Sequence, residues 1–262
     1  ILLLGLFMQK RALIIGCGYV GQRLYKALYK IGWIIETISK TPKNQQGHRS
    51  IDVGYEFTLK KEYDVVFYMV SASNYSSEAY KLAYHTGVDH AIQALQCRGN
   101  KRPRFIFVSS TSVFAENRGG IVSEVSPIQQ EHFSHKSLIA GEALVRQSGF
   151  SYSILRLSGI YGPDRLSFID RLKKREIRLK KSTVISNRIH VEDCVGALIH
   201  LALMKQPQTL YIGVDHEPTS YNEIVVWLSA LLDIELPAIE EKEKFSIHMS
   251  NKKCSNKRLV DS

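Results

Sequence analysis

The stretch that decides the fold lies near the start of the 262-residue chain and reads Arg11-Ala12-Leu13-Ile14-Ile15-Gly16-Cys17-Gly18-Tyr19-Val20-Gly21. A short apolar run ends in G-x-G-x-x-G spacing, and an amphipathic pattern follows. Glycine permits a tight turn, a close approach of the backbone to a pyrophosphate, and close helix–strand packing. The amino end of the following helix offers N–H groups to phosphate. The stretch predicts a dinucleotide-binding loop formed by Gly16, Cys17, Gly18, Tyr19, Val20 and Gly21.

Apolar runs and amphipathic stretches alternate along most of the chain. Runs typical of buried strands occur at residues 12–15, 33–38, 65–70, 104–108 and 152–157, with a short further strand at 51–53. Three- and four-residue apolar spacing predicts helices at 19–31, 78–96 and 134–147. Because strand–helix alternation produces parallel sheets, we predict an α/β fold with a Rossmann-type doubly wound parallel sheet.

Later elements extend beyond this repeat. Residues 191–204 and 221–232 have helical patterns, and 209–212 resemble a strand. We therefore predict a dinucleotide-binding Rossmann core over residues 8–163. A small C-terminal substrate lobe of mixed structure, with elements that return to the core, is expected over 164–262.

Composition excludes several classes of protein. Hydrophobic residues make up 44% and charged residues 23% of the chain, which are ordinary globular values and argue against a disordered, collagen-like or multi-span membrane protein. The formal net charge of +10 suits an anionic partner without selecting one. Four scattered cysteines (Cys17, Cys97, Cys194 and Cys254) predict cytosolic thiols and no metal site.

The apolar opening, residues 1–8, is too short to span a bilayer and follows no positive segment of a signal peptide. We expect Met8 to be the true start, with residues 1–7 a start-site artefact. A cytoplasmic protein with no membrane partner is predicted.

The end of the second strand bears on the choice of cofactor. NAD enzymes usually have an acid there, whereas a base accommodates the 2′-phosphate of NADP. This strand ends in Ser39 and Lys40, and Glu36 lies too early in it. The pattern favours NADP, held by Ser39 and Lys40, with NAD as the alternative. A solvated loop lysine remains the other interpretation of Lys40.

Four ordered motifs carry a family resemblance: residues 16–21, 108–114 (VSSTSVF), 155–163 (LRLSGIYGP) and 187–193 (NRIHVED). In these motifs the chain resembles the extended short-chain dehydrogenase/reductase superfamily and, more narrowly, its nucleoside-diphosphate-sugar epimerase/dehydratase group. The resemblance implies an NAD(P) cofactor and a small-molecule, nucleotide-linked substrate. It adds cofactor contacts at Asp52, Val70, Ser71, Ala72, Ser109 and Lys136.

The family's chemistry uses a tyrosine, a lysine four residues later, and a serine or threonine after the fifth strand. The resemblance places the last two at Lys136 and Ser110, but His132 stands where the tyrosine belongs. Histidine can perform acid–base chemistry near neutral pH, so His132 is a candidate catalytic residue beside Ser110 and Lys136. The alternative is a surface histidine in a linker. The acidic pair of the dehydratases is replaced by Thr111 and Ser112, which disfavours a 4,6-dehydratase.

Two basic stretches remain. Residues 171–181 are expected either to meet substrate phosphates or to form a solvated face, and 252–258 are expected to be a solvated tail. The first lacks interleaved aromatic residues for stacking bases, which argues against nucleic acid. The sequence thus predicts an NAD(P)-binding oxidoreductase or epimerase-like protein without the usual catalytic tyrosine. The alternative is a non-catalytic NAD(P)-binding sensor or scaffold. A homodimer is what the family resemblance implies.

Overall fold

The computed structural model describes residues 9–97, 102–241 and 251–262. The expected start at Met8 lies outside them. Contacts divide the described residues into two compact units. Among the described residues, unit 1 draws on those up to Ser109, on Gln130–Leu155 and on Val195–Leu210. Unit 2 draws on Ser110–Gln129, Arg156–Cys194 and the described residues from Tyr211 onward. Each unit thus takes segments from several parts of the chain, and the predicted boundary at residue 163 stays a prediction.

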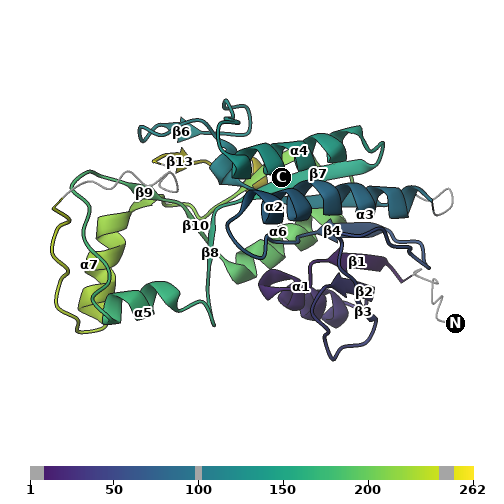
Figure 1. Cartoon of the computed structure of the whole chain (residues 1–262), viewed down its shortest axis with the longest axis horizontal. Helices are drawn as coiled ribbons and strands as arrows, with labels where there is room; N and C mark the ends of the chain where they lie inside the picture. The colour runs from purple at the N-terminus through teal and green to yellow at the C-terminus, as the bar shows by residue number, and fades with distance from the viewer. Residues whose placement is uncertain (1–8, 98–101, 242–250) are drawn as a thin grey trace, which may run out of the picture. The chain divides into compact units, whose positions relative to one another are not determined.

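The main sheet of the described residues has seven strands, several of which are labelled in Figure 1. Its strands, in spatial order, are β11 (Leu210–Gly213), β7 (Ser151–Leu157), β5 (Arg104–Ser110), β4 (Val65–Tyr68), β1 (Arg11–Ile15), β2 (Ile34–Ser39) and β3 (His48–Ser50). β1 pairs in parallel with β2 on one side and with β4 on the other. The strand order therefore reverses at β1, which is the topological switch point where ligands bind in such sheets. The predicted Rossmann-type parallel sheet is confirmed.

The apolar runs become the buried strands because both faces of the sheet are covered. Every residue of β4 is buried, and so are Ala12–Ile15 of β1. Figure 1 shows α2 (Ser77–Lys81), α3 (Gly87–Gln96) and α4 (Phe133–Gln147) over one face, with α1 (Tyr19–Lys30) and α6 (Val191–Leu203) over the other. Leu13, Phe105 and Phe107 belong to the main apolar core of unit 1.

Two local predictions in unit 1 need correction. The strand expected at 51–53 is wrong, since β3 is the preceding polar segment His48–Ser50, which pairs with β2 at the sheet edge. A strand at the edge of a sheet needs fewer apolar residues. The apolar pattern therefore placed the strand at 51–53, three residues after its actual position. The helix expected at 78–96 is interrupted by the π-helical turn η1 (Leu82–Thr86). The Tyr68 hydroxyl donates to the Ala83 carbonyl in this turn at 2.6 Å.

Unit 2 is built from short elements. Three two-stranded sheets join β8 (Gly159–Tyr161) to β10 (Arg188–His190), β9 (Ile185–Ser186) to β12 (Thr219–Ser220), and β6 (Ile121–Val122) to β13 (Lys253–Cys254). The helices are α5 (Ser167–Lys173), α7 (Tyr221–Leu231) and α8 (Lys257–Val260), with the 3-10 turn η2 (Thr111–Val113). In the part of the chain that the structure describes, no helix is long and apolar enough to cross a membrane.

The expectation of a solvated tail at 252–258 is wrong. β13 pairs in parallel with β6, and Lys252 is only 1% exposed. Asn187 holds the segment from its side chain, donating to the Lys252 carbonyl and accepting from the Cys254 N–H, both at 2.8 Å. The Lys252 ammonium donates to the Phe114 carbonyl at 3.3 Å, and burial lowers the pKa of Lys252. Burial alternates along this strand, with Lys252 and Cys254 buried and Lys253 exposed. The basic residues made this alternation impossible to recognise from the sequence.

Candidate cofactor-binding site and the start of α4

A cavity of about 350 Å³ opens in unit 1 at the carboxyl ends of the parallel strands. Its walls come from the connections after β1, β2, β3 and β4, together with residues of α2 and η1. This is the position expected for a ligand at a topological switch point. Its volume is within the range of about 300–1,000 Å³ that is usual for small-molecule sites.

The glycine loop has the geometry that its spacing predicts. Gly16 has φ of 103°, and a Cβ there would overlap the backbone of Met69 and Val70. A Cβ on Gly21 would collide with the Gly16 carbonyl, so this glycine lets α1 pack against the loop. Gly18 is different, because its Cβ position is open space at the cavity. It is also the N-cap of α1. Because glycine has no side chain, the N–H groups of the first turn of α1 are not capped by it and stay available to a ligand. The loop therefore fits a pyrophosphate.

The polar wall of the cavity contains an ion pair. The Lys40 ammonium lies 2.9 Å from the Asp52 carboxylate, with exposed side-chain fractions of 82% and 24%. The Gly54 N–H, followed by Lys40, lowers the pKa of Asp52. The bond to Asp52 in turn raises the pKa of Lys40. Lys40 thus faces the cavity as predicted, but an acid from the end of β3 already holds it.

Glu36 has no part in this wall. It is buried in β2, where it pairs with Arg49 at 3.3 Å and Lys61 at 3.5 Å. An acid inside β2 is therefore used in structural ion pairs, in line with its early position in the strand.

Eight predicted cofactor residues line the cavity together: Gly16, Cys17, Gly18, Ser39, Lys40, Asp52, Val70 and Ser71. Tyr19, Val20 and Gly21 continue from the loop into α1. Ala72, Ser109 and Lys136 are not among the lining residues. The backbone of Ala72 is hydrogen-bonded to Tyr84, and the Ser109 hydroxyl donates to the buried Glu142 at 2.8 Å. Their roles toward a cofactor stay predictions.

Sequence reasoning missed Lys43, which lines the cavity from the loop between β2 and β3. Gln45 anchors this loop, donating to the Cys17 thiol at 3.3 Å and to the Thr37 hydroxyl at 2.8 Å. The Thr37 hydroxyl is also hydrogen-bonded to Nδ1 of His48 at 2.9 Å. Burial raises the pKa of Cys17, so its thiol stays protonated near neutral pH. Examining the whole connection after β2, rather than its first residue, would have found Lys43.

His132 is the N-cap of α4. Its Nδ1 accepts from the Ser134 N–H at 3.3 Å and lies 2.9 Å from the Ser134 hydroxyl. Because Nδ1 accepts this N–H, the neutral ring carries its proton on Nε2. His132 is half-buried and caps α4 through one ring nitrogen, so it is not simply a surface histidine of a linker. Its catalytic role stays a prediction.

A phenol that no sequence pattern indicated, that of Tyr75, lies beside this imidazole. The Tyr75 ring stacks on His132 at a centroid distance of 5.6 Å and an angle of 14°, with its hydroxyl 3.3 Å from Nδ1. Phe133 and Tyr80 pack against Tyr75 at centroid distances of 5.0 and 5.4 Å. Tyr75 follows the cavity-lining Ser73 by two residues but precedes His132 by 57, so no local pattern links the pair.

The other two predicted catalytic residues belong to different units. Lys136 is exposed in the first turn of α4, and its N–H donates to the His132 carbonyl at 3.0 Å. His132 and Lys136 are therefore one helical turn apart on the same side of α4. Ser110 belongs to unit 2, where its hydroxyl caps η2 by accepting from the Ser112 N–H at 3.1 Å. The convergence of Ser110 with Lys136 stays a prediction.

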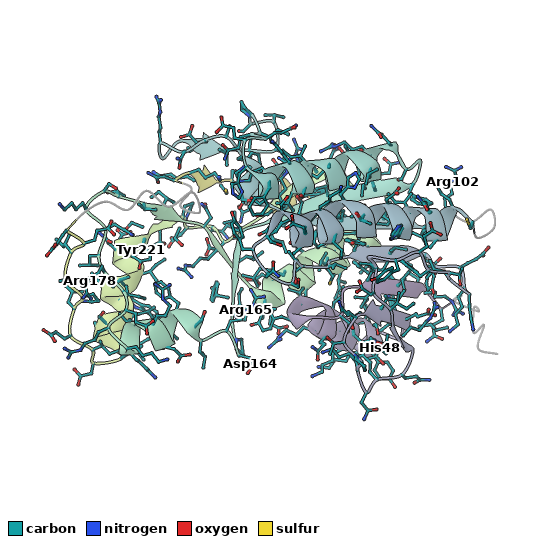
Figure 2. The ribbon with its side chains drawn as sticks, viewed as in Figure 1. His48, Arg102, Asp164, Arg165, Arg178 and Tyr221 are labelled. Atoms are coloured by element: carbon teal, nitrogen blue, oxygen red, sulfur yellow. The ribbon has the colours of Figure 1, made fainter. Side chains whose placement is uncertain are left out.

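The basic stretch 171–181 is only partly solvated. Leu172 and Ile177 are buried in a core of unit 2, and Lys180 pairs with Glu240 at 2.6 Å. Figure 2 labels Arg178 on the segment after α5 and Tyr221 at the start of α7. Within residues 9–97, 102–241 and 251–262, no group of three or more His, Cys, Asp or Glu side chains is placed to hold a metal ion.

Comparison with known proteins places this chain in a family. The family model described as "NAD dependent epimerase/dehydratase family" matches residues 12–213, which is most of the chain. The chain belongs to the NAD-dependent epimerase/dehydratase family. The four motifs that carried the resemblance all lie within the matched residues.

Three relatives of this epimerase/dehydratase family member illustrate the match. The uncharacterized UDP-glucose epimerase YtcB of Bacillus subtilis (strain 168) is 25% identical over 213 residues, which cover 74% of this chain and 64% of YtcB. The match thus spans less than two thirds of that relative. A structure from Methylobacillus flagellatus, described as an NAD-dependent epimerase/dehydratase, has 27% identity and a TM-score of 0.75, covering 96% of this chain and 91% of that one. MoeE5, solved with UDP-glucuronic acid and NAD, shares the fold at 20% identity and a TM-score of 0.77, covering 96% and 91%.

Proposed function

We propose that this family member binds NAD(P) in the cavity of unit 1 and acts as an oxidoreductase or epimerase-like protein that lacks the usual catalytic tyrosine. The observation that carries the proposal is the open space at Gly18, where an uncovered helix start meets a cavity at the strand switch point. Gly16, Gly18 and the first turn of α1 would hold the pyrophosphate. Ser39, Lys40 and Asp52 would surround the adenosine end, with a preference for NADP.

A bound nicotinamide would supply the capacity to accept and return a hydride. The chain would have to move the matching proton. Without a tyrosine at position 132, the candidate groups at the start of α4 are the His132 imidazole and the Tyr75 phenol, 3.3 Å apart. Lys136 is one turn further along the same helix, where its positive charge would favour an anionic oxygen. We propose weak hydride chemistry with retained cofactor binding, on a small nucleotide-linked substrate such as the one bound by MoeE5.

A non-catalytic NAD(P) sensor or scaffold is the second candidate, and one observation favours it. The imidazole in the tyrosine's place is engaged by its Nδ1 in capping α4, so it serves the helix whether or not any substrate binds. A homodimer and a cytoplasmic location complete the proposal.

Calorimetric titration with NAD and NADP tests the shared premise, and hydride exchange with sugar nucleotides and simple carbonyls separates the two candidates. Micromolar binding with measurable exchange supports the enzyme. Equal binding without exchange across the whole panel supports the sensor. If neither NAD nor NADP binds, both the enzyme and the sensor proposals are overturned.

A further inference from the structure

Two lysines line the polar wall of the cavity, but their surroundings differ. Lys40 is largely exposed and already paired with Asp52 at 2.9 Å. Lys43 is half-buried, and within the described residues it has no ion-pair partner. A phosphate that binds at this wall therefore meets two lysines: Lys40, which is paired with Asp52, and Lys43, which has no carboxylate partner among the described residues.

Lys43 is also the better-positioned cation. Gln45 fixes its loop to Cys17 and Thr37, which belong to the glycine loop and to β2. The positive charge of Lys43 acts on the glycine loop and on β3, since it is one of the influences that lower the pKa of the Cys17 thiol and of the His48 imidazole. A half-buried cation on an anchored loop loses less conformational freedom on binding than an exposed lysine does.

We infer that Lys43 is the principal cation for the 2′-phosphate of NADP, and that Asp52 sets the choice between NAD and NADP by holding Lys40 away from that phosphate. This inference rests on the proposed function, because it requires the cavity to bind a dinucleotide. A phosphate dianion near Asp52 meets a like charge, and it gains Lys40 only when the ammonium leaves its carboxylate partner. Asp52 therefore limits the preference for NADP that the lysines create.

The inference predicts opposite effects for two neighbouring changes. Lys43→Ala removes a charge-assisted bond to phosphate, so the ratio of NADP to NAD affinity should fall about tenfold. Asp52→Asn removes the competing carboxylate and releases Lys40, so the same ratio should rise about fivefold. Lys40→Ala should lower the ratio by only about twofold, because Asp52 already holds this ammonium.

The experiment is calorimetric titration of the full chain with four probes: NAD, NADP, 5′-AMP and 2′,5′-ADP. The two small probes isolate the adenosine end from the nicotinamide. Lys26→Ala, on the exposed side of α1, is the matched control and should leave the ratio unchanged. Circular dichroism and the thermal midpoint establish that each variant is folded.

An unchanged ratio in Lys43→Ala, or an unchanged or lower ratio in Asp52→Asn, would overturn this inference while leaving the proposed function intact. Failure of the unaltered chain to bind any of the four probes would instead overturn the proposed function, and this inference with it.

Discussion

The glycine loop and the start of α4 lie in the same unit, but they keep the family pattern to different degrees. At the loop, every glycine has the geometry that its position in the motif requires. At α4 the lysine is kept, while the residue four positions earlier has become a helix cap. The residues proposed to hold a dinucleotide thus agree with the family resemblance, whereas His132 departs from it. We therefore expect dinucleotide binding to be retained more fully than proton transfer.

The difference has a physical basis. In the proposed function, the loop would bind the pyrophosphate through backbone N–H groups and the open space at Gly18, and a larger side chain there would obstruct both. At the start of α4, a single side chain decides the chemistry. The Nδ1 atom of His132 accepts the Ser134 N–H and so caps the helix, whereas a tyrosine has no acceptor atom this close to its own backbone. One substitution can therefore stabilise the helix and remove the phenol together.

The largest effect should come from filling the loop. Gly18→Val places a side chain in open space toward the cavity, and its φ of −86° suits any residue. We expect NAD and NADP affinity to fall at least about a hundredfold, through lost contact with the pyrophosphate, while the fold is retained. Calorimetry measures the affinity. Gly196→Ala is the control, since that helical glycine also has open space around its Cβ position but lies outside the cavity lining. Undiminished binding by Gly18→Val would show that the phosphate loop is misassigned.

The next change restores the missing phenol. His132→Tyr rebuilds the spacing of tyrosine and Lys136, and we expect hydride exchange to rise about tenfold over His132→Phe, since acid–base groups contribute about 10²–10⁴-fold when well placed. Exchange of label between reduced cofactor and carbonyl substrates is the measurement. Tyr75→Phe in the unaltered chain shows whether the existing phenol contributes. Strong exchange that survives both His132→Phe and Tyr75→Phe would mean that another residue moves the proton.

Capping should give a smaller, purely structural effect. His132→Ala removes the acceptor of the Ser134 N–H, so the free energy of unfolding should fall by about 0.5–2 kcal/mol. His132→Asn supplies another acceptor and should recover most of that loss. Denaturant unfolding of the three proteins decides the matter, and equal stability of all three would show that the cap carries no weight.

The smallest effect concerns pH. The folded-state pKa of Asp52 is lowered by the Gly54 N–H and by Lys40, so this carboxylate adds stability above its unfolded pKa, near 4. That stability is lost as the pH falls through the lower folded value. The pair is partly exposed, so the contribution should be less than about 1 kcal/mol. Thermal midpoints of the unaltered chain and Asp52→Asn should therefore converge below pH 4. A constant gap from pH 7 to pH 3 would contradict the assignment.

Short sequence patterns correctly predicted the features whose structure is set by neighbouring residues in the chain. The buried strands at β1 and β4, the glycine loop and the paired positions of His132 and Lys136 all follow from short-range spacing. Contacts between distant segments could not be predicted: Asp52 reaching Lys40, Tyr75 stacking on His132, and Asn187 holding Lys252 and Cys254. β3 and β13 are strands because they pair with β2 and β6, not because they are apolar, so their polar residues did not indicate strands.

The interleaving of the two units has a consequence for synthesis of the chain. Arg104 begins β5, and its guanidinium donates to the carbonyls of Leu201 at 2.9 Å and Lys205 at 3.2 Å, at the end of α6. Those carbonyls do not exist until about a hundred further residues have been translated, which takes about 5–20 s at 5–20 residues per second. We therefore expect unit 1 to complete its folding only after residues 195–210 have been translated. The last segment of unit 1, Val195–Leu210, follows two of the three segments of unit 2 in the chain.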